Sequence, residues 1–325
     1  MAGLNTVAKL GGYIGTYLNQ MALPIFHENT IFDRAIDSMY TIPNNETNEM
    51  TWYIPTKMSE FDELAAEGVT PDGQDYTQST ITKTLHWYGS WSGTTDIVKL
   101  QYNTPVIQNI DTELLHAAQK TYDSLIRVEA LTTTNLGGAS SNALIGSYAG
   151  TIASVGGQLT IGTFREVSQL LLEAGAETYY NFEMGSARVG SSAAWNAYLC
   201  IAPVQMRGSI LTMTGFLEAK DYSNGSPAAY ELGAVDMFRV FYTDNAATSL
   251  GASANGLNVY PIFFFGRKAM GGVKIGGGGM MTYFDDFGTG SDILRQRCAL
   301  GRKFQAANKI LNDSWMFVMY AEQYV

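Results

Sequence analysis

Apolar positions along the chain recur with the period of strands in some segments and of helices in others. Residues 47–57 alternate between apolar and polar side chains, and a second alternating run follows over residues 81–88. A period of two places the apolar side chains on one face of a strand, so these runs predict a long hairpin. The residues between them are mostly polar and include Gly68, Pro71 and Gly73, which favour turns.

Two segments show helical spacing of apolar residues. A helix of about twenty residues, roughly 30 Å long, is predicted over Asp111–Val128. Asp111 is predicted to cap it, because its charge complements the amino-terminal end of the helix dipole. A second helix is predicted over Thr163–Ala174, and Gly175 is expected to end it.

Further strands are predicted in the second half of the chain, whereas residues 1–45 are broken by glycine and proline and predict an extended arm that packs on something else. The predicted strands are Tyr198–Ala202, Ala234–Tyr242, Val259–Phe265, Gly271–Tyr283 with an interruption at glycines 276–279, and Arg302–Leu311 and Ser314–Ala321 as strands or a hairpin about Asn312 and Asp313. Helices and strands that do not alternate strictly indicate the α+β class.

The composition adds information about the surface. Only 15% of residues are charged, against about 25% in typical soluble domains, which suggests surfaces that contact other protein. The net charge is −10, and residues 1–126 hold 15 acids and 6 bases, a net of −9. Proteins that bind nucleic acid tightly normally present a basic patch, so tight DNA binding is not expected.

Two short segments carry charge of one sign. One holds six acids and no base: Glu60, Asp62, Glu63, Glu67, Asp72 and Asp75. The other holds five bases and no acid: Arg295, Arg297, Arg302, Lys303 and Lys309.

No residue pattern identifies a catalytic, cofactor or metal site. The three histidines, His27, His86 and His116, lie in different predicted elements. Residues 190–194 lack the closing glycine of a nucleophile elbow, although a hydrolase using Ser192 stays an alternative. Asp285 with Asp286 lacks a third oxygen-rich partner for a cation. We therefore predict no enzyme activity, cofactor or metal.

The cysteines and the apolar runs bear on the compartment. Cys200 and Cys298 are predicted to be buried thiols in a reducing compartment. The longest intense apolar run, Val259–Phe265, is far short of the ~20 residues of a membrane span. The N-terminus lacks the pattern of a signal peptide, so we predict a soluble protein with no membrane partner.

Read in order, seven segments resemble the major capsid proteins of tailed bacteriophages in the group that includes podovirus N-4, which have the HK-97-like fold. The segments are residues 67–74 (EGVTPDGQ), 89–96 (GSWSGTTD), 111–128, 159–174, 259–266 (VYPIFFFG), 295–302 (RQRCALGR) and 310–315 (ILNDSW). The similarity runs through most of residues 20–321 and is weak in residues 176–257.

The resemblance implies a division of the chain into the parts of this fold. These are an N-terminal arm (1–45), an extended hairpin called the E-loop (46–95), a peripheral domain with a long spine helix (96–175), an axial domain (176–284) and C-terminal strands of the peripheral domain (285–325). The fold implies an icosahedral shell around double-stranded DNA, with no enzymatic site and no cofactor.

The resemblance also implies partners and a location. The expected partners are further copies of the chain in pentamers and hexamers, a separate scaffolding protein, a portal, in some systems a decoration protein, and DNA that is contacted weakly. The expected location is the virion, after synthesis in the bacterial cytoplasm. In this fold the E-loop overlies a neighbouring peripheral domain, so we hypothesise that the acidic segment docks near the basic segment of an adjacent subunit. The alternatives are an encapsulin-type compartment, the hydrolase and another phage structural component.

Overall fold

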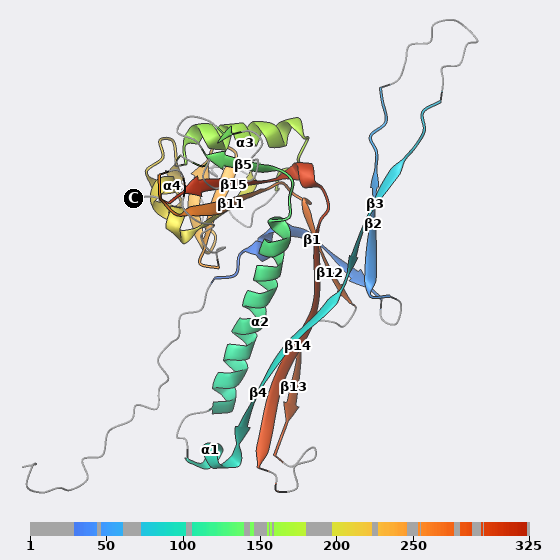
Figure 1. Ribbon diagram of the computed structural model, residues 1–325, viewed down its shortest axis with the longest axis vertical. Helices are drawn as coiled ribbons and strands as arrows, with labels where there is room; N and C mark the ends of the chain where they lie inside the picture. Colours follow the sequence, from blue (N-terminus) through green and yellow to red (C-terminus); the bar gives the residue numbers. More distant parts are fainter. Residues whose placement is uncertain are drawn as a thin grey trace, which may run out of the picture.

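The computed structural model describes two sheets, a long helix and a projecting hairpin (Figure 1). The described residues are 29–43, 47–60, 73–101, 106–139, 144–145, 155, 157, 159–179, 197–222, 227–245, 253, 255–275, 280–287, 294 and 296–323.

The body of the molecule is an eight-stranded sheet in the order β6-β5-β15-β11-β7-β10-β9-β8. Its strands are β5 (Leu136–Ala139), β6 (Leu144–Ile145), β7 (Tyr198–Pro203), β8 (Leu217–Glu218), β9 (Glu231–Val235), β10 (Phe238–Thr243), β11 (Val259–Phe265) and β15 (Met316–Glu322). Every residue of β7, β11 and β15 is buried. Burial on both faces explains why these strands are continuous apolar runs.

Each face of this sheet has its own core. On one face α3 (Ile161–Glu173) packs Phe164 against Phe264 of β11. On the other face Phe263 packs edge-on against Phe32, with ring centroids 5.1 Å apart. Phe32 lies in the short helix η1 (Phe32–Ala35). Consecutive residues of β11 therefore serve opposite cores, as the pleat of a strand requires.

The second sheet is long and narrow. Its central strand is β14 (Arg297–Ile310), which pairs with β12 (Met270–Ile275) through residues 307–310, with β13 (Met281–Asp285) through residues 299–303 and with β4 (His86–Thr95) through residues 297–306. Strand β1 (Ile36–Ile42) pairs with β12. The 14 residues of β14 span about 46 Å. Helix α2 (Val106–Ala130) runs along this sheet (Figure 1). The short helix α1 (Asp96–Gln101) follows β4.

The predicted hairpin is confirmed for its first strand, but the predicted second strand, residues 81–88, breaks at Leu85: residues 81–84 belong to β3 of the hairpin and residues 86–88 to β4 of the long sheet. Strands β2 (Glu49–Pro55) and β3 (Gln78–Thr84) pair antiparallel as a separate two-stranded sheet, with Trp52 opposite Ile81. An apolar cluster of Ile42, Trp52, Leu85, Val273 and Ala307 lies at its base. From there β2 and β3 project away from the body (Figure 1).

Short helices complete the described chain. They are η3 (Val204–Met206), α4 (Arg207–Leu211), η4 (Ala219–Asp221) and η5 (Asp313–Trp315). Helix α3 begins at a capping box made by Thr160 and Thr163, and Gly175 with a φ of +66° follows its last turn. The predicted helix at 163–174 and its end at Gly175 are confirmed.

Two local predictions are wrong at their boundaries. Helix α2 begins at Val106, five residues before Asp111, because the apolar spacing already starts there. Asp111 is therefore no cap; it lies inside the helix and pairs with Arg302. The strand predicted at Ala234–Tyr242 is a hairpin of β9 and β10 that turns at Asp236, whose φ is +49°.

Two predictions fail on longer-range pairing. The irregular arm predicted for residues 1–45 contains η1 and β1, and β1 pairs parallel with β12 of the same chain. Strands β14 and β15 do not form a hairpin. Each belongs to a different sheet, and the turn at Asn312 carries the chain from one sheet to the other.

Candidate assembly surfaces

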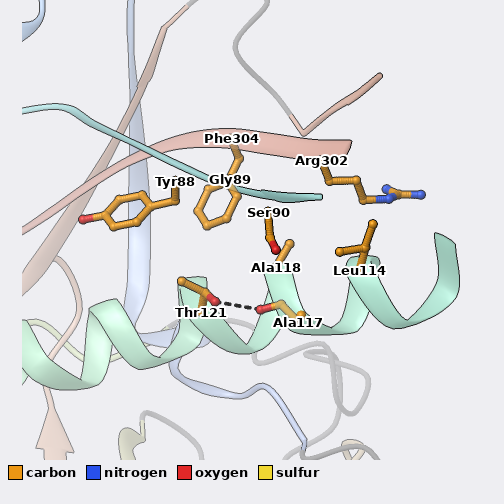
Figure 2. A pocket seen from close by; sticks show the side chains of 9 residues that line it. All are labelled: Tyr88, Gly89, Ser90, Leu114, Ala117, Ala118, Thr121, Arg302 and Phe304. Atoms are coloured by element: carbon orange, nitrogen blue, oxygen red, sulfur yellow. Dashed lines mark hydrogen bonds between the residues drawn. The ribbon is translucent and has the colours of Figure 1, made fainter. Parts of the chain in front are cut away.

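The two faces of the long sheet differ because residues of β4 point alternately to each side. Tyr88 and Ser90 face α2, and Tyr88 stacks on Phe304 of β14 with ring centroids 5.6 Å apart. A cavity of about 160 Å³ lies between them and the helix. Figure 2 shows the small side chains Ala117 and Ala118 on the helix side of this cavity.

The lining of the cavity gives it no evident chemistry. It is mainly apolar, and the hydroxyl of Thr121 donates to the carbonyl of Ala117 at 2.7 Å (Figure 2). Arg302 lines it as well, but its guanidinium is paired with Asp111, Nη2 to Oδ1, at 2.6 Å. The cavity therefore brings together no nucleophile and base.

The opposite face of the long sheet carries exposed aromatic rings. Trp87 and Trp91 of β4 are 55% and 73% exposed, and Tyr283 of β13 is 51% exposed. Lys303 of β14 lies between the strands, with Nζ 4.9 Å from the ring centre of Trp87 and 4.7 Å from that of Tyr283. Both distances suit cation–π attraction. We call Trp87, Trp91, Tyr283 and Lys303 the aromatic face.

Glycine lets the largest ring of this face lie close to the sheet. Gly301 is directly opposite Trp91 in the pairing of β14 with β4. A Cβ atom at Gly93 would lie 3.4 Å from a ring carbon of Trp91 and 3.2 Å from the carbonyl oxygen of Cys298. The Trp91 ring therefore extends over Gly93, and its outer side is exposed.

The basic segment has several partners within the chain. Arg302 pairs with Asp111, and Lys309 Nζ lies 3.0 Å from Glu129 Oε1. Lys303 belongs to the aromatic face. Arg297 is exposed at the start of β14, and Arg295 lies outside the described residues. The charge that this segment presents to another molecule is therefore smaller than its five bases suggest.

The acidic segment is described only at its two ends. Glu60 and Asp75 are exposed, whereas Asp62, Glu63, Glu67 and Asp72 lie outside the described residues. The side chain of Gln74 donates to the carbonyl of Glu60 at 3.2 Å, which ties the two sides together. The hairpin β2–β3 and the start of β14 lie at opposite ends of the molecule (Figure 1). Contact between the two charged segments would therefore join two chains.

A buried polar cluster joins α2 to the N-terminal segment and to the end of β10. Asp123 accepts hydrogen bonds from the backbone N–H of Phe32 at 2.7 Å and from Nδ2 of Asn245 at 2.8 Å. Arg127 donates to the carbonyl of Asn245 at 2.6 Å. Burial raises the pKa of Asp123 to about 6, although these hydrogen bonds act in the opposite direction.

The other candidate residues do not form a site. His86 is exposed in β4 and His116 is half-buried in α2, while His27 and Ser192 lie outside the described residues. Asp285 is exposed at the end of β13. In the described part of the chain, no group of three or more His, Cys, Asp or Glu side chains is placed to hold a metal ion.

The cysteines lie in different sheets. Cys200 is buried in β7 and Cys298 in β14, so the predicted burial of both thiols is confirmed. Burial raises the pKa of the Cys200 thiol. No helix in the described ranges is both long and apolar enough to cross a membrane.

Sequence reasoning missed the aromatic face and the ion pairs around Glu129. The alternation noted over residues 81–88 continues through β4, and following it would have placed Trp87 and Trp91 on one side. No local pattern signals Glu129, because its partners Lys83 and Lys309 are distant in the sequence.

Comparison with known proteins gives no match by sequence but clear matches by structure. No protein-family model matches the chain, and no curated sequence is significantly similar to it. Solved structures match over nearly the whole chain. The capsid of Ralstonia phage GP4 has a TM-score of 0.68 at 11% identity and covers 99% of both chains.

Two further structures agree. The capsid of the cyanophage P-SCSP1u has a TM-score of 0.66 at 14% identity, covering 97% of this chain and 95% of its own. The capsid of a native GTA particle has a TM-score of 0.63 at 12% identity, covering 98% of this chain and 100% of its own. The N-4-like group is not singled out and stays a prediction. The chain has the α+β, HK-97-like fold of phage capsid proteins.

Proposed function

We propose that this protein is the major capsid protein of a tailed phage, which assembles into the icosahedral shell around double-stranded DNA. The observation that carries the proposal is the match to several phage capsid chains over at least 95% of both partners, with a TM-score of up to 0.68. A match of this extent accounts for the fold of nearly the whole chain. None of the comparisons supports the encapsulin or hydrolase alternatives.

The surface supports a protein that is built to contact copies of itself. Large apolar side chains that are exposed together mark protein contacts more often than isolated ones do. The aromatic face presents three such rings on one side of the long sheet, while α2 covers the other side. In the hairpin, Tyr53 of β2 is also exposed, and so is Met58, which follows β2.

We further propose that the hairpin of one subunit docks on the long sheet of its neighbour. The acidic segment would lie near the basic segment, toward Arg295, Arg297 and Lys303. Within their own chain Arg302 pairs with Asp111 and Lys309 with Glu129. Exposed ion pairs contribute only about 0–1 kcal/mol each. Their main effect would be to fix the register and speed association, while burial of the aromatic face supplies most of the affinity.

The remaining parts of the proposal concern partners, domains and location. The chain would form pentamers and hexamers, assemble on a separate scaffolding protein, join a portal and in some systems a decoration protein, and contact DNA weakly. Its role would be structural, without catalysis or a cofactor, in a virion whose subunits are made in the bacterial cytoplasm. The division into arm, E-loop, peripheral and axial domains belongs to this proposal.

Negative-stain microscopy with light scattering on the purified chain tests the function. Closed shells, or rings of five and six subunits, are expected over a range of salt and protein concentrations. Co-expression with the candidate scaffolding protein is the second condition, because some shells need a scaffold. A uniform small species under both conditions would contradict the proposal.

A further inference from the structure

A buried carboxylate lies where the hairpin, the long helix and the long sheet meet. Glu129 is in the last turn of α2, and its Oε2 lies 2.9 Å from Nζ of Lys83 in β3. Its Oε1 lies 3.0 Å from Nζ of Lys309 in β14. The Glu129 side chain is 11% exposed, and the two lysine side chains are 31% and 33% exposed. One carboxylate thus joins elements from three distant parts of the sequence.

We call Glu129, Lys83 and Lys309 the triad, and the two lysines determine the charge state of the glutamate. Burial raises the pKa of Glu129, but the two lysine ammonium groups outweigh burial and hold the pKa below its usual value. The carboxylate is therefore charged at neutral pH. Removing a partner from a buried charge costs more than breaking an exposed pair, since the charge left behind is poorly solvated. The contact between Lys83 and Glu129 is thus harder to break than a surface ion pair.

The other contacts at the base of the hairpin restrict the direction of β2 and β3 less strongly. The apolar cluster around Trp52 and Leu85 holds the base by contacts that depend little on direction. In the described chain no third strand pairs with β2 or β3, and β3 is joined to the long sheet through Leu85, after which β4 pairs with β14 from His86. The backbone pairing thus holds the chain up to the base of the hairpin, and within the described residues no ladder beyond the base fixes the angle of β2 and β3. A charged hydrogen bond such as that from Lys83 to Glu129 does depend on direction.

We propose that Glu129, through its contact with Lys83, is a positioning residue that sets the angle at which the hairpin leaves the molecule. The strand from Lys83 to Gln78 spans about 17 Å, so a swing of about 10° at the base moves Gln78 by about 3 Å. A displacement of that size takes hydrogen-bonding groups out of reach. The consequence for assembly rests on the proposed function, because there the angle decides where the hairpin meets its neighbour.

The triad itself offers a matched pair of variants. Lys83→Met and Lys309→Met each remove one cation from Glu129 at similar exposure, but only Lys83 belongs to the hairpin. Spin labels at the exposed positions Thr80 and Gln119 would report the distance between hairpin and α2 by pulsed electron paramagnetic resonance. The two native cysteines are buried, and labelled chain is diluted with unlabelled chain to remove signals between subunits.

Lys83→Met and Lys309→Met are expected to differ in the distance between the two spin labels but not in thermal stability. Thr80 lies about 10 Å along the strand from Lys83, so Lys83→Met should shift the mean distance by up to about 2 Å or broaden its distribution, and Glu129→Gln should do the same. Lys309→Met should keep the wild-type distribution. Thermal unfolding should show similar losses for both lysine variants, which separates a change of angle from general loosening.

Two results would overturn the proposal. One is a Lys83→Met distance distribution equal to that of the wild type; the other is an equal change in Lys309→Met. The distances do not depend on shell formation, so a wild type that forms no shells would contradict the proposed function and leave this test intact. Where shells form, Lys83→Met should yield fewer closed ones than Lys309→Met.

Discussion

The eight-stranded sheet and the long sheet with its hairpin use their side chains in opposite ways. In the eight-stranded sheet both faces are covered, and β11 sends Phe264 into one core and Phe263 into the other. In the long sheet α2 covers one face, while Trp87, Trp91 and Tyr283 remain exposed on the other. The hairpin is a two-stranded sheet of its own.

The difference indicates where each region obtains its stability. The eight-stranded sheet buries apolar side chains on both faces within one chain, so its packing does not depend on another molecule. An isolated two-stranded hairpin is marginal in water, and it gains stability by packing against something else. We therefore expect the first region to determine whether the chain folds and, under the proposed function, the second to make the contacts with other subunits.

The largest effect is expected in the core of the eight-stranded sheet. The Phe264 ring is fully buried between Phe164 and Phe238, with centroids 5.3 Å and 4.9 Å away. Phe264→Ala should reduce the free energy of unfolding by about 3–5 kcal/mol, because it removes buried area and leaves a cavity. Urea denaturation followed by circular dichroism measures this. A loss below about 1 kcal/mol would mean that this sheet does not dominate subunit stability.

The next effect concerns the junction of the two regions at Asp123. Its pKa rises from 3.8 to about 6 in the folded chain, so the folded state binds more protons between these pH values. The free energy of unfolding should therefore fall as the pH rises from about 4 to 6, by up to about 3 kcal/mol. The slope of unfolding free energy against pH should be smaller in Asp123→Asn. Equal slopes in variant and wild type would contradict this assignment.

A smaller and selective effect is expected from the aromatic face. Trp91→Ala should change the unfolding free energy of the subunit by less than about 0.5 kcal/mol, since the ring is 73% exposed. It should nevertheless weaken association by about 2 kcal/mol if the ring is buried between subunits. Light scattering measures assembly across protein concentrations. Leu172→Ala, which removes an exposed side chain from α3, is the matched control and should assemble more nearly like the wild type.

The same division explains which features could be predicted from the sequence. The first strand of the hairpin and α3 follow from local alternation and capping, so their positions were predicted closely. The alternation over residues 81–88 continues across the break between β3 and β4, so it could not show where the hairpin ends. The start of α2 was misplaced because Asp111 has the residue type of a cap. Its actual partner, Arg302, is 191 residues away, so no local sequence pattern indicates the pair.

The errors in pairing have a related cause. The turn at Asn312 is typical of a hairpin, but β14 and β15 find partners in two different sheets. Strand order depends on which faces the rest of the chain can cover, and that is a property of the whole fold. The candidate contact surfaces were predicted from charge alone, so the aromatic face went unnoticed although its strand had been predicted in part.

The smallest effect per residue is expected from the charged segments. Changing Glu67, Asp72 and Asp75 to Lys should slow assembly and weaken its dependence on salt, because each exposed pair contributes only about 0–1 kcal/mol. Changing Arg295 and Arg297 to Glu in the same chain should restore assembly, as the introduced lysines and glutamates again carry opposite charges. Stopped-flow light scattering at low and high salt measures the rates.

A charge reversal also separates the two contributions to docking. Rates that change while the final shell yield stays constant would assign the charges to steering and the aromatic face to affinity. An unchanged rate in the triple Lys variant would mean that the acidic and basic segments never meet. In that case the shape and the apolar rings of the aromatic face, rather than the charges of the two segments, would have to select the neighbouring subunit.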